Sequence, residues 1–590
     1  MPVSAGYSLP TPDGTTTYEE VLAGFEWDLP ETFNLGAVVD ADDETPPETT
    51  ALVHVDDADE THRFTYGELE AAATALGSHL VDAGLEAGDR IALCFPQSPE
   101  LLVAHLATYR IGCLAVPLSV ILGAESLSYT LEHSDATALL ADARVSDRFE
   151  STLADRDFDY ELAVDLGGVD AETDDGKRYA GPNRHLGGYA GHVPADADHE
   201  VVPTAPADPA IVVYTSGTSG KPKGVVQTHQ YVIGALPSYQ CWFHCFESTH
   251  RERVWTPAEW SWAGALFDVV FPTLALGGTV VSRVRRSGFG PERALELVER
   301  QRVSRAFMPP TALWQIRQHA DPSARDLDSL EVVMCGGEKL SAPLARWAER
   351  ELDVVVNESY GQTEANALIG NCRALFESRE DSMGKPYPGH ECRIVDEEYR
   401  PVEPGEVGQI ALERPDPVLF DGYWNDEAAT EECFADGLYL TGDLATQDED
   451  GYVHFAGRAD DLIITAGYRV SPAEVESALC TAPGVTEAAV GGVPDEERGQ
   501  RIKAYVLLEG DARDENEGED GRGEGSENEN GDENEEETDS GEDGRPSADA
   551  LRQHVRERLG AHKAPREVVV LEEPPQTRTG KLDRSALFPT

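Results

Sequence analysis

The run from Val213 to Gly224 (Val-Tyr-Thr-Ser-Gly-Thr-Ser-Gly-Lys-Pro-Lys-Gly) has the composition of a phosphate-binding loop. Its glycines let the backbone approach a ligand closely, and its amide N–H groups, hydroxyls and lysines are donors that phosphate oxygens accept. The residue order differs from the G-x-x-x-x-G-K-[ST] pattern of the Walker A loop. A flexible linker is the alternative, but a linker would not follow an apolar strand (Ala210–Tyr214) or use two of the chain's eight lysines. We predict phosphate contacts from Thr215, Ser216, Gly217, Thr218, Ser219, Gly220, Lys221 and Lys223.

The elements that must position this loop alternate between helix and strand. A capping-box pattern at Thr65–Glu68 opens one helix, and Ser98–Glu100, with proline at the first helical position, opens another. Apolar runs at Arg90–Phe95 and Cys113–Pro117 predict strands, and a similar alternation recurs over residues 282–359. Strand–helix–strand order of this kind predicts a parallel α/β sheet.

The charge balance limits the possible partners. The 590 residues include 47 Lys and Arg against 110 Asp and Glu, a net charge of −63. This balance excludes electrostatic binding to nucleic acid or to an anionic membrane surface. No apolar run approaches the ~18 residues of a spanning helix. The N-terminus shows no secretory signal pattern, so we expect a cytoplasmic protein without stable membrane insertion.

The acidic excess is spread along the whole chain. The segment Asp511–Pro546 holds 17 acidic residues and 3 Arg, and without its net −14 the remainder still carries −49. Because Ala512 is its single aliphatic residue, we predict a disordered acidic insertion, although a functional acidic arm stays open. The scarcity of lysine resembles the composition of proteins from salt-accumulating halophiles. Salt near ~1 M shortens the Debye length to ~3 Å and screens self-repulsion, so we predict a salt requirement.

The nine cysteines show no disulfide framework. Cys241, His244, Cys245 and His250 lie close together in sequence, but their spacing does not match a zinc site and no second cysteine pair follows. We therefore expect buried free thiols.

Six further motifs follow the loop along the chain. They are Met334–Glu338, Glu358–Glu364 (Glu-Ser-Tyr-Gly-Gln-Thr-Glu), Tyr439–Asp443, Gly457–Asp461, Thr465–Arg469 and Arg578–Lys581. Together with the loop, and in this order, they resemble the core motifs of the adenylate-forming superfamily: acyl-CoA synthetases, luciferases and peptide-synthetase adenylation domains. The resemblance covers roughly residues 30–590 apart from the acidic insertion, and it is strongest to the acetyl- and medium-chain acyl-CoA synthetase branch.

The resemblance implies a reaction with ATP, Mg²⁺ and CoA, in which a carboxylic acid becomes acyl-AMP and then acyl-CoA. Joining two anions depends mainly on positioning and charge neutralisation. The implied catalytic residues are Lys581 and Arg469 near the acid and α-phosphate, with Thr363 and Glu364 on the magnesium side. Tyr360 is implied to stack on adenine. The implied nucleotide contacts beyond the loop are Gly336, Gly337, Glu338, Glu358, Ser359, Tyr360, Gly361, Gln362, Asp443 and Arg458, the last two at the ribose.

The implied fold is α/β, with two α/β subdomains and a small β-barrel in an N-terminal domain (residues 1–456). A hinge (457–461) around Asp460 then leads to a smaller mobile α+β domain (462–590) that contains the acidic insertion (511–546). This domain is implied to present Lys581 in one pose and a pantetheine tunnel in another. The implied CoA-binding residues are Gly467, Tyr468, Arg498 and Lys563.

The acid is expected to be medium-chain, branched or aryl. Acetate-specific relatives carry a tryptophan immediately before Gln-Thr-Glu, where this chain has Gly361. Trp255, Trp260 and Trp262 fall where the superfamily places its aromatic acyl-pocket segment, although packed core is the alternative for such a cluster.

Three other functions are considered. The first is a ligase that loads a carrier protein; no carrier domain with a phosphopantetheine serine is visible, and Gly467 with Arg498 favours CoA. The second is a luciferase-type oxygenase. The third is a non-catalytic nucleotide-binding regulator, which would be expected to have lost Lys581, Glu364 or the loop lysines. The oligomeric state stays open.

Overall fold

The computed structural model describes residues 6–12, 15–142, 160–163, 172–173, 200–215, 222–246, 252–284, 288–459, 463–465, 468–495, 499–508, 546–571, 575 and 584–588. The chain separates into two compact units. Unit 1 comprises Met1–Thr441 and Gln447–His454, and unit 2 comprises Gly442–Thr446 and Phe455–Thr590. The predicted acidic insertion lies outside the described residues except for Pro546.

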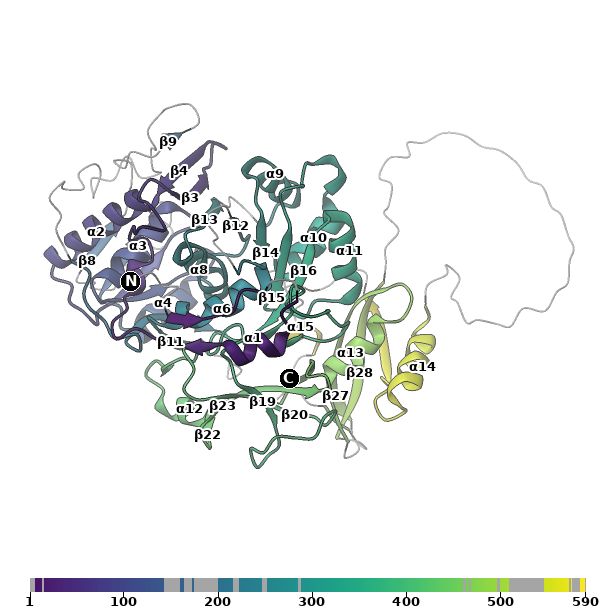
Figure 1. The fold of residues 1–590 in the computed structure, drawn as a ribbon. Helices are drawn as coiled ribbons and strands as arrows, with labels where there is room; N and C mark the ends of the chain where they lie inside the picture. The colour runs from purple at the N-terminus through teal and green to yellow at the C-terminus, as the bar shows by residue number, and fades with distance from the viewer. Residues whose placement is uncertain are drawn as a thin grey trace, which may run out of the picture. The chain divides into compact units, whose positions relative to one another are not determined.

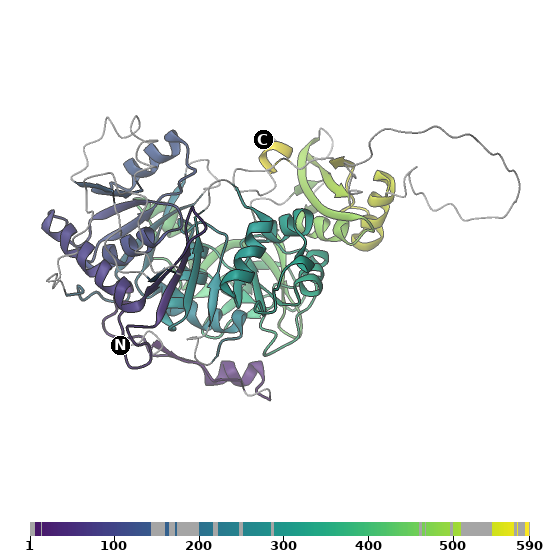
Figure 2. The same ribbon diagram turned by 90° about the horizontal axis from the view of Figure 1, so that it is seen from above.

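The first sheet of unit 1 contains the two strands that flank the phosphate loop. Its strand order is β21-β11-β10-β6-β5-β7-β8, parallel from β10 to β8 and antiparallel at β11 and β21. Helices α2 and α3 pack against each other beside this sheet (Figures 1 and 2). The strands are β5 (Arg90–Cys94), β6 (Leu114–Pro117), β7 (Ala138–Ala141), β8 (Tyr160–Ala163), β10 (Pro209–Thr215), β11 (Lys223–Thr228) and β21 (Gly422–Tyr423).

The helices that flank the first sheet begin where the caps predict. Thr65 accepts a hydrogen bond from the Glu68 amide and the Glu68 side chain accepts one from the Thr65 amide, which starts α2 (Tyr66–Asp82). Ser98 accepts from the Leu101 amide at the start of α3 (Pro99–Arg110). Both predicted helices and the parallel sheet are confirmed.

The second sheet of unit 1 has ten strands in the order β18-β17-β16-β15-β14-β12-β13-β3-β4-β9. Strands β3, β13, β12, β14, β15 and β16 are parallel to one another, which confirms the alternation predicted over residues 282–359. The strands are β3 (Thr50–Val55), β4 (Thr61–Thr65), β9 (Glu172–Thr173), β12 (Arg253–Trp255), β13 (Thr279–Arg283), β14 (Arg305–Phe307), β15 (Val332–Gly336), β16 (Val355–Tyr360), β17 (Ile369–Gly370) and β18 (Lys385–Pro386).

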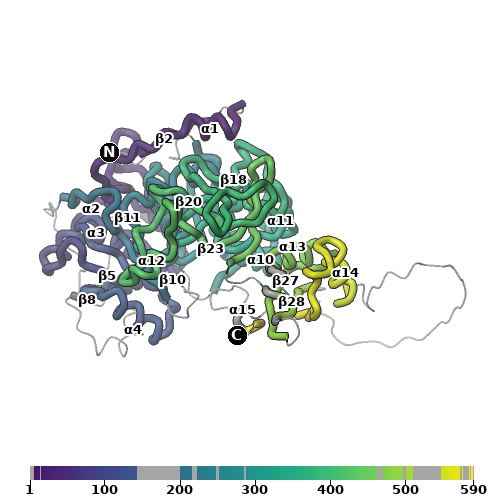
Figure 3. Tube along the Cα trace, turned by 90° about the horizontal axis from the view of Figure 1, so that it is seen from below, coloured from purple at the N-terminus to yellow at the C-terminus, as the bar shows by residue number. Residues whose placement is uncertain are grey.

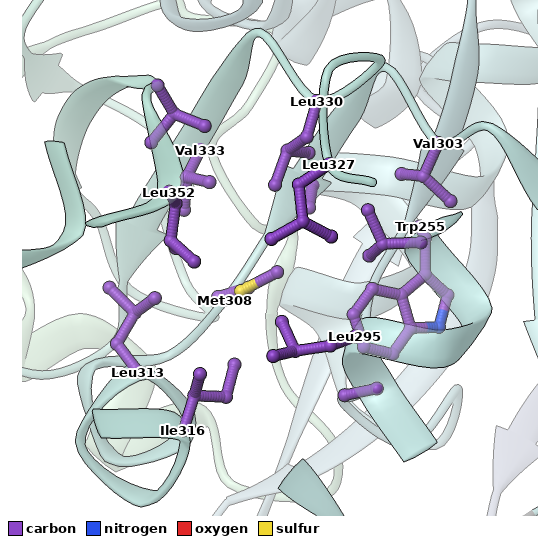
Figure 4. Close-up of a cluster of buried hydrophobic side chains, with 14 of the residues drawn as sticks. Trp255, Leu295, Val303, Met308, Leu313, Ile316, Leu327, Leu330, Val333 and Leu352 are labelled. Atoms are coloured by element: carbon purple, nitrogen blue, oxygen red, sulfur yellow. The ribbon is translucent and has the colours of Figure 1, made fainter. Parts of the chain in front are cut away.

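A large apolar core packs against this second sheet. Figure 4 shows Trp255 next to Leu295 and Val303, with Met308 and Leu313 farther along the same cluster. Trp255 is 4% exposed. It is therefore packed core, which was the alternative to an acyl-pocket role for this residue.

Antiparallel strands occupy the part of the chain where the small β-barrel was expected. The sheet order is β19-β20-β23-β22, with β24 paired to β23. The strands are β19 (Cys392–Val395), β20 (Gly408–Glu413), β22 (Phe434–Ala435), β23 (Leu438–Gln447) and β24 (Val453–Arg458).

The N-terminal segment lies along unit 1. β1 (Tyr7–Ser8) pairs with β2 (Glu26–Trp27), and Figure 3 shows α1 (Tyr18–Gly24) and β2 lying along unit 1. The Tyr18 hydroxyl donates to the Pro386 carbonyl of β18 at 2.6 Å. The other helical elements of unit 1 are η2 (Leu35–Ala37), α4 (Ala124–His133), α6 (Tyr231–Phe243), α7 (Ala263–Ala265), the π-helical η3 (Leu266–Val270), α8 (Phe271–Ala275), α9 (Pro291–Gln301), α10 (Pro310–His319), η4 (Pro322–Ala324), α11 (Ala342–Leu352) and α12 (Glu427–Glu432).

Unit 2 is an α+β fold around its own core. Its sheet has the order β26-β25-β28-β27, with β29 parallel to β28. Ser471 and Ser547 cap its two longer helices, because their side chains accept hydrogen bonds from the Glu474 and Ala550 amides. The elements are β25 (Ile463–Thr465), β26 (Tyr468–Val470), α13 (Pro472–Cys480), β27 (Val485–Asp495), β28 (Gly499–Leu508), α14 (Ala548–Leu559), β29 (Glu567–Leu571) and α15 (Arg584–Leu587).

Two further expectations can be compared with the structure. All nine cysteines are free, and Cys241 and Cys245 are buried, which confirms the prediction of buried thiols for this pair. In the described part of the chain, no helix has both the length and the apolar composition needed to cross a membrane.

Candidate active site

The predicted phosphate loop joins two paired strands. β10 leads into it and β11 leads out, with Thr215 directly opposite Lys223 in the antiparallel register. Both ends of the loop are therefore fixed by backbone pairing. The remaining predicted phosphate contacts, Ser216, Gly217, Thr218, Ser219, Gly220 and Lys221, lie outside the described residues.

One face of helix α4 also holds both ends of this loop. The Tyr129 hydroxyl donates to the Pro222 carbonyl at 3.1 Å, and His133 Nδ1 lies 2.9 Å from the Tyr214 hydroxyl. The two α4 rings stack with their centroids 5.3 Å apart, as side chains four residues apart on a helix can. Burial raises the pKa of Tyr214, so its hydroxyl stays protonated. This contact could not be predicted from the sequence, because nothing in the sequence shows which helix lies next to the loop.

The Gln-Thr-Glu segment folds back on itself directly after β16. The Gln362 amide donates to the Ala365 carbonyl at 2.8 Å, and the Ala365 amide donates to the Gln362 carbonyl at 3.2 Å. Gln227 Nε2 on β11 donates to the Thr363 carbonyl at 2.7 Å. The loop that carries the predicted magnesium ligands is thus fixed to the strand that leaves the phosphate loop.

Gly361 has a backbone role in this segment. A Cβ at Gly361 would lie 2.2 Å from the amide nitrogen of Ala367 and 2.9 Å from the carbonyl carbon of Asn366. From the sequence, the absence of a side chain at Gly361 predicted an open acyl pocket. The structure adds an independent reason for glycine, because the backbone returns too close for any side chain.

The Glu364 carboxylate and the Lys223 ammonium both contact Tyr423. The Tyr423 hydroxyl donates to Glu364 Oε1 at 2.8 Å, and Lys223 Nζ lies 4.6 Å from the centroid of the same ring. The structure therefore brings a predicted phosphate contact and a predicted magnesium ligand to one residue. Tyr423 was not among the site residues predicted from the sequence.

The predicted adenine-binding residues come from two parallel strands. β15 and β16 pair so that Gly336 lies opposite Ser359. Gly337 has φ of +77°, and a Cβ there would lie 3.0 Å from the ring of Trp262. The Trp262 ring therefore lies directly against Gly337, and Tyr360 ends the neighbouring strand β16. Figure 1 shows β15 and β16 side by side in the second sheet.

Glu358 lies opposite Cys335 in the same pair of strands. The Leu340 amide donates to its Oε1 at 3.1 Å, and burial raises the pKa of Glu358 to about 7. Through this hydrogen bond the Glu358 carboxyl fixes the chain that follows Glu338.

The predicted acyl-pocket tryptophans differ in their surroundings. Trp260 is 1% exposed, whereas the Trp262 ring lies against Gly337 and packs on Phe307 with centroids 5.5 Å apart. Of these, Trp262 is the one that meets a predicted nucleotide residue. The pocket role of Trp260 and Trp262 stays a prediction.

A buried carboxylate close to Trp262 escaped sequence analysis. Asp268 lies in the π-helical turn, accepts a hydrogen bond from Asn366, and has Oδ2 3.1 Å from where a Cβ on Gly264 would be. Burial raises the pKa of Asp268 to about 7. The pattern Ala-Leu-Phe-Asp-Val-Val reads as an apolar run, and only the fold shows that Asp268 supports the loop carrying Glu364.

The predicted ribose-binding pair meets within unit 2. Arg458 Nη1 lies 3.5 Å from Asp443 Oδ1, and the Ala459 amide donates to the Gly442 carbonyl at 2.9 Å. The Asp443 side chain is 8% exposed, so the carboxylate is held rather than freely solvated. The structure brings these two residues together as expected.

The predicted CoA-binding residues are less fully described. Lys563 Nζ lies 2.5 and 2.7 Å from the two carboxylate oxygens of Glu474, in the first turn of α13. Its charge is therefore compensated within unit 2. Tyr468 and Arg469 lie on β26, opposite Thr465 and Ile464 of β25, but their side chains are outside the described set. Gly467, Arg498, Asp460 and Lys581 also lie outside the described residues.

Comparison with known proteins identifies the family. The model of the AMP-binding enzyme family matches residues 39–424, and that of the AMP-binding enzyme C-terminal domain matches residues 474–520 and 534–581. The chain belongs to the AMP-binding enzyme family. This AMP-binding enzyme is 32% identical over 540 residues to a feruloyl-CoA synthase of Amycolatopsis sp, covering 91% of the chain and 94% of the relative.

Two other similarities extend over almost the whole chain. An acetyl-coenzyme A synthetase of Bacillus subtilis (strain 168) is 29% identical, with 97% of this chain and 94% of the relative covered. The crystal structure of a Brucella canis acyl-CoA synthetase superposes with a TM-score of 0.68 at 27% identity, covering 97% of this chain and 98% of that one. The AMP-binding enzyme therefore has the fold implied by its motifs.

Proposed function

We propose that this AMP-binding enzyme activates a medium-chain, branched or aryl carboxylic acid and transfers it to CoA. Its reaction class is that of the AMP-forming acid–CoA ligases, in which acid and ATP give acyl-AMP and pyrophosphate, and CoA then gives acyl-CoA and AMP. ATP, Mg²⁺ and CoA are accordingly its co-substrates and metal. The assignment of the active site rests on one observation. The Lys223 ammonium and the Glu364 carboxylate both contact Tyr423.

The residues of unit 1 fit a nucleotide and its metal. Gly336 and Gly337, at the end of β15, carry no side chains of their own and lie next to the Trp262 ring, and Glu364 offers the hard carboxylate oxygen that Mg²⁺ prefers. Thr363 and Glu364 would hold the metal, which supplies positive charge to the phosphates. Lys223 and the hydroxyl-rich loop add hydrogen bonds and charge to the same phosphates.

Positive charge is what the first half-reaction needs most. A carboxylate must approach a phosphate, so two anions have to be held together and their repulsion reduced. Lys581 and Arg469 are assigned to the acid and the α-phosphate, and Asp443 with Arg458 to the ribose. The pairing of Asp443 with Arg458 supports that assignment, because it fixes a buried acceptor next to a donor.

The second half-reaction is assigned to the C-terminal domain (462–590), which moves at residues 457–461 around Asp460. The division of the chain between His454 and Phe455, next to this hinge motif, supports the assignment. One pose presents Lys581, and the other presents Gly467, Tyr468 and the CoA contacts Arg498 and Lys563. For Lys563 this requires exchange of Glu474 for a CoA phosphate.

We further propose an aryl, branched or medium-chain acid as the substrate and the cytoplasm as the location of the enzyme. Gly361 has no side chain to close the pocket, and the feruloyl-CoA synthase relative is named for an aryl acid. Nine free cysteines fit a reducing compartment, which supports a cytoplasmic enzyme.

An acid panel in molar KCl tests the function. AMP release should depend on a medium-chain, branched or aryl acid, and acyl-CoA should form in equal amount when CoA is added. Acid-dependent pyrophosphate exchange without CoA-dependent thioester would favour a ligase that loads a carrier protein. Absence of AMP with every acid would favour a non-catalytic nucleotide-binding regulator.

A further inference from the structure

Tyr423 occupies a position that is fixed from both sides. It lies opposite Val225 in the antiparallel pairing of β21 with β11, and the next residue, Trp424, donates its amide to the Gly224 carbonyl at 2.7 Å. The Tyr423 amide donates to Thr430 Oγ1 at 2.8 Å, which ties it to α12. The backbone of Tyr423 therefore moves with the strand that carries Lys223.

The side chain of Tyr423 uses its two chemical parts separately. Its ring face lies 4.6 Å from Lys223 Nζ, within the range of a cation–π interaction. Its hydroxyl donates to Glu364 Oε1 at 2.8 Å, a hydrogen bond strengthened by the negative charge of the acceptor.

This arrangement keeps two opposite charges near each other without neutralising them. Lys223 and Glu364, both within the described chain, form no ion pair with each other. A direct pair would occupy the ammonium and the carboxylate that the phosphates and the metal require. Tyr423 instead holds one oxygen of Glu364 and leaves the second available, and it holds Lys223 by its ring, an interaction that leaves N–H groups for phosphate.

We propose that Tyr423 is a positioning residue that couples the phosphate-binding lysine to the magnesium-binding carboxylate. The inference rests on the proposed function of Lys223 and Glu364 and adds a residue to it. Loss of the hydroxyl frees Glu364 to turn toward Lys223, which weakens the magnesium site. Loss of the ring also frees Lys223, which weakens contact with the phosphates.

Two variants and a matched control separate these effects. Tyr423→Phe keeps the ring, and Tyr423→Leu removes both parts. Tyr66→Phe is the control, because the buried Tyr66 hydroxyl donates to two backbone carbonyls, of Leu274 at 2.9 Å and Gly278 at 2.8 Å, away from the site. The readouts are the Mg²⁺ activation constant of acid-dependent ATP–pyrophosphate exchange and the KM for ATP at saturating Mg²⁺.

Tyr423→Phe should raise the Mg²⁺ activation constant about tenfold, as expected for the loss of one charge-assisted hydrogen bond, with little change in the KM for ATP. Tyr423→Leu should raise both constants, and Tyr66→Phe neither. An unchanged Mg²⁺ constant in Tyr423→Phe, or the same shift in Tyr66→Phe, would overturn the inference. If the wild-type enzyme shows no acid-dependent exchange, the proposed function fails first. If the wild type is active and Tyr423→Phe behaves like it, only the role of Tyr423 fails.

Discussion

Replacing Gly361 with alanine should disrupt the Gln-Thr-Glu loop as a whole. The new Cβ would lie 2.2 Å from the Ala367 amide nitrogen and 2.9 Å from the Asn366 carbonyl carbon. Both are backbone atoms in a loop closed by hydrogen bonds between Gln362 and Ala365, so no side-chain rotation relieves the overlap. Overpacking costs about 1–3 kcal/mol, and contact with backbone places this variant at the upper end, about 3 kcal/mol.

The assay compares stability and activity across acids. Gly361→Ala should lower the Tm and reduce ATP–pyrophosphate exchange by a similar factor for every acid, because Thr363 and Glu364 move with the loop. Gly288→Ala is the matched control, since a Cβ there meets no atom of the described residues within 4 Å, and its effect should stay within about 0.5 kcal/mol. If Gly361→Ala kept the wild-type Tm and lost only long or aryl acids, Gly361 would serve the pocket alone and this reasoning would be wrong.

Three further predictions concern pH, salt and the C-terminal lysine. Burial raises the pKa of Asp268 to about 7, above its unfolded value of about 3.9, so its protonated form stabilises the fold at low pH and this contribution is lost as pH rises toward 7. The Tm of Asp268→Asn minus that of wild type should therefore become more positive between about pH 5 and about pH 8. A difference in Tm that stays constant with pH would contradict a raised pKa at Asp268. The net charge of −63 predicts a Tm that rises steeply between ~0.1 and ~1 M KCl, and full stability and activity at ~0.1 M would refute the salt requirement. Lys581→Ala should nearly abolish acyl-AMP formation while sparing thioester formation from supplied acyl-AMP, and equal loss of both half-reactions would exclude two poses.

Local sequence patterns were enough to predict several helices and strands correctly. Thr65 with Glu68, and Ser98, each begin a helix where the sequence predicts a cap, because a cap satisfies backbone donors within the same few residues. The strand before the phosphate loop was recognisable for a similar reason, since an apolar run and a glycine-rich turn are both local patterns.

The contacts that organise the site could not be predicted in this way. Tyr423 and Glu364 are 59 residues apart, and Tyr129 and Pro222 are 93 apart, so their meeting depends on sheet order rather than on any local pattern. Trp255 illustrates a second difficulty, because its residue type fits two different roles. Tryptophan fits a pocket wall and a core equally well, and only the packing against Leu295 and Val303 decides between them.

The stoichiometry of the complete reaction tests the central claim most directly. Wild-type enzyme in molar KCl would be given a responsive acid, ATP, Mg²⁺ and CoA, and the nucleotide and thioester products measured together. An AMP-forming acid–CoA ligase predicts equal amounts of AMP, pyrophosphate and acyl-CoA, with none formed when the acid is omitted. Formation of ADP and phosphate instead, or AMP that appears without any acid, would contradict the account.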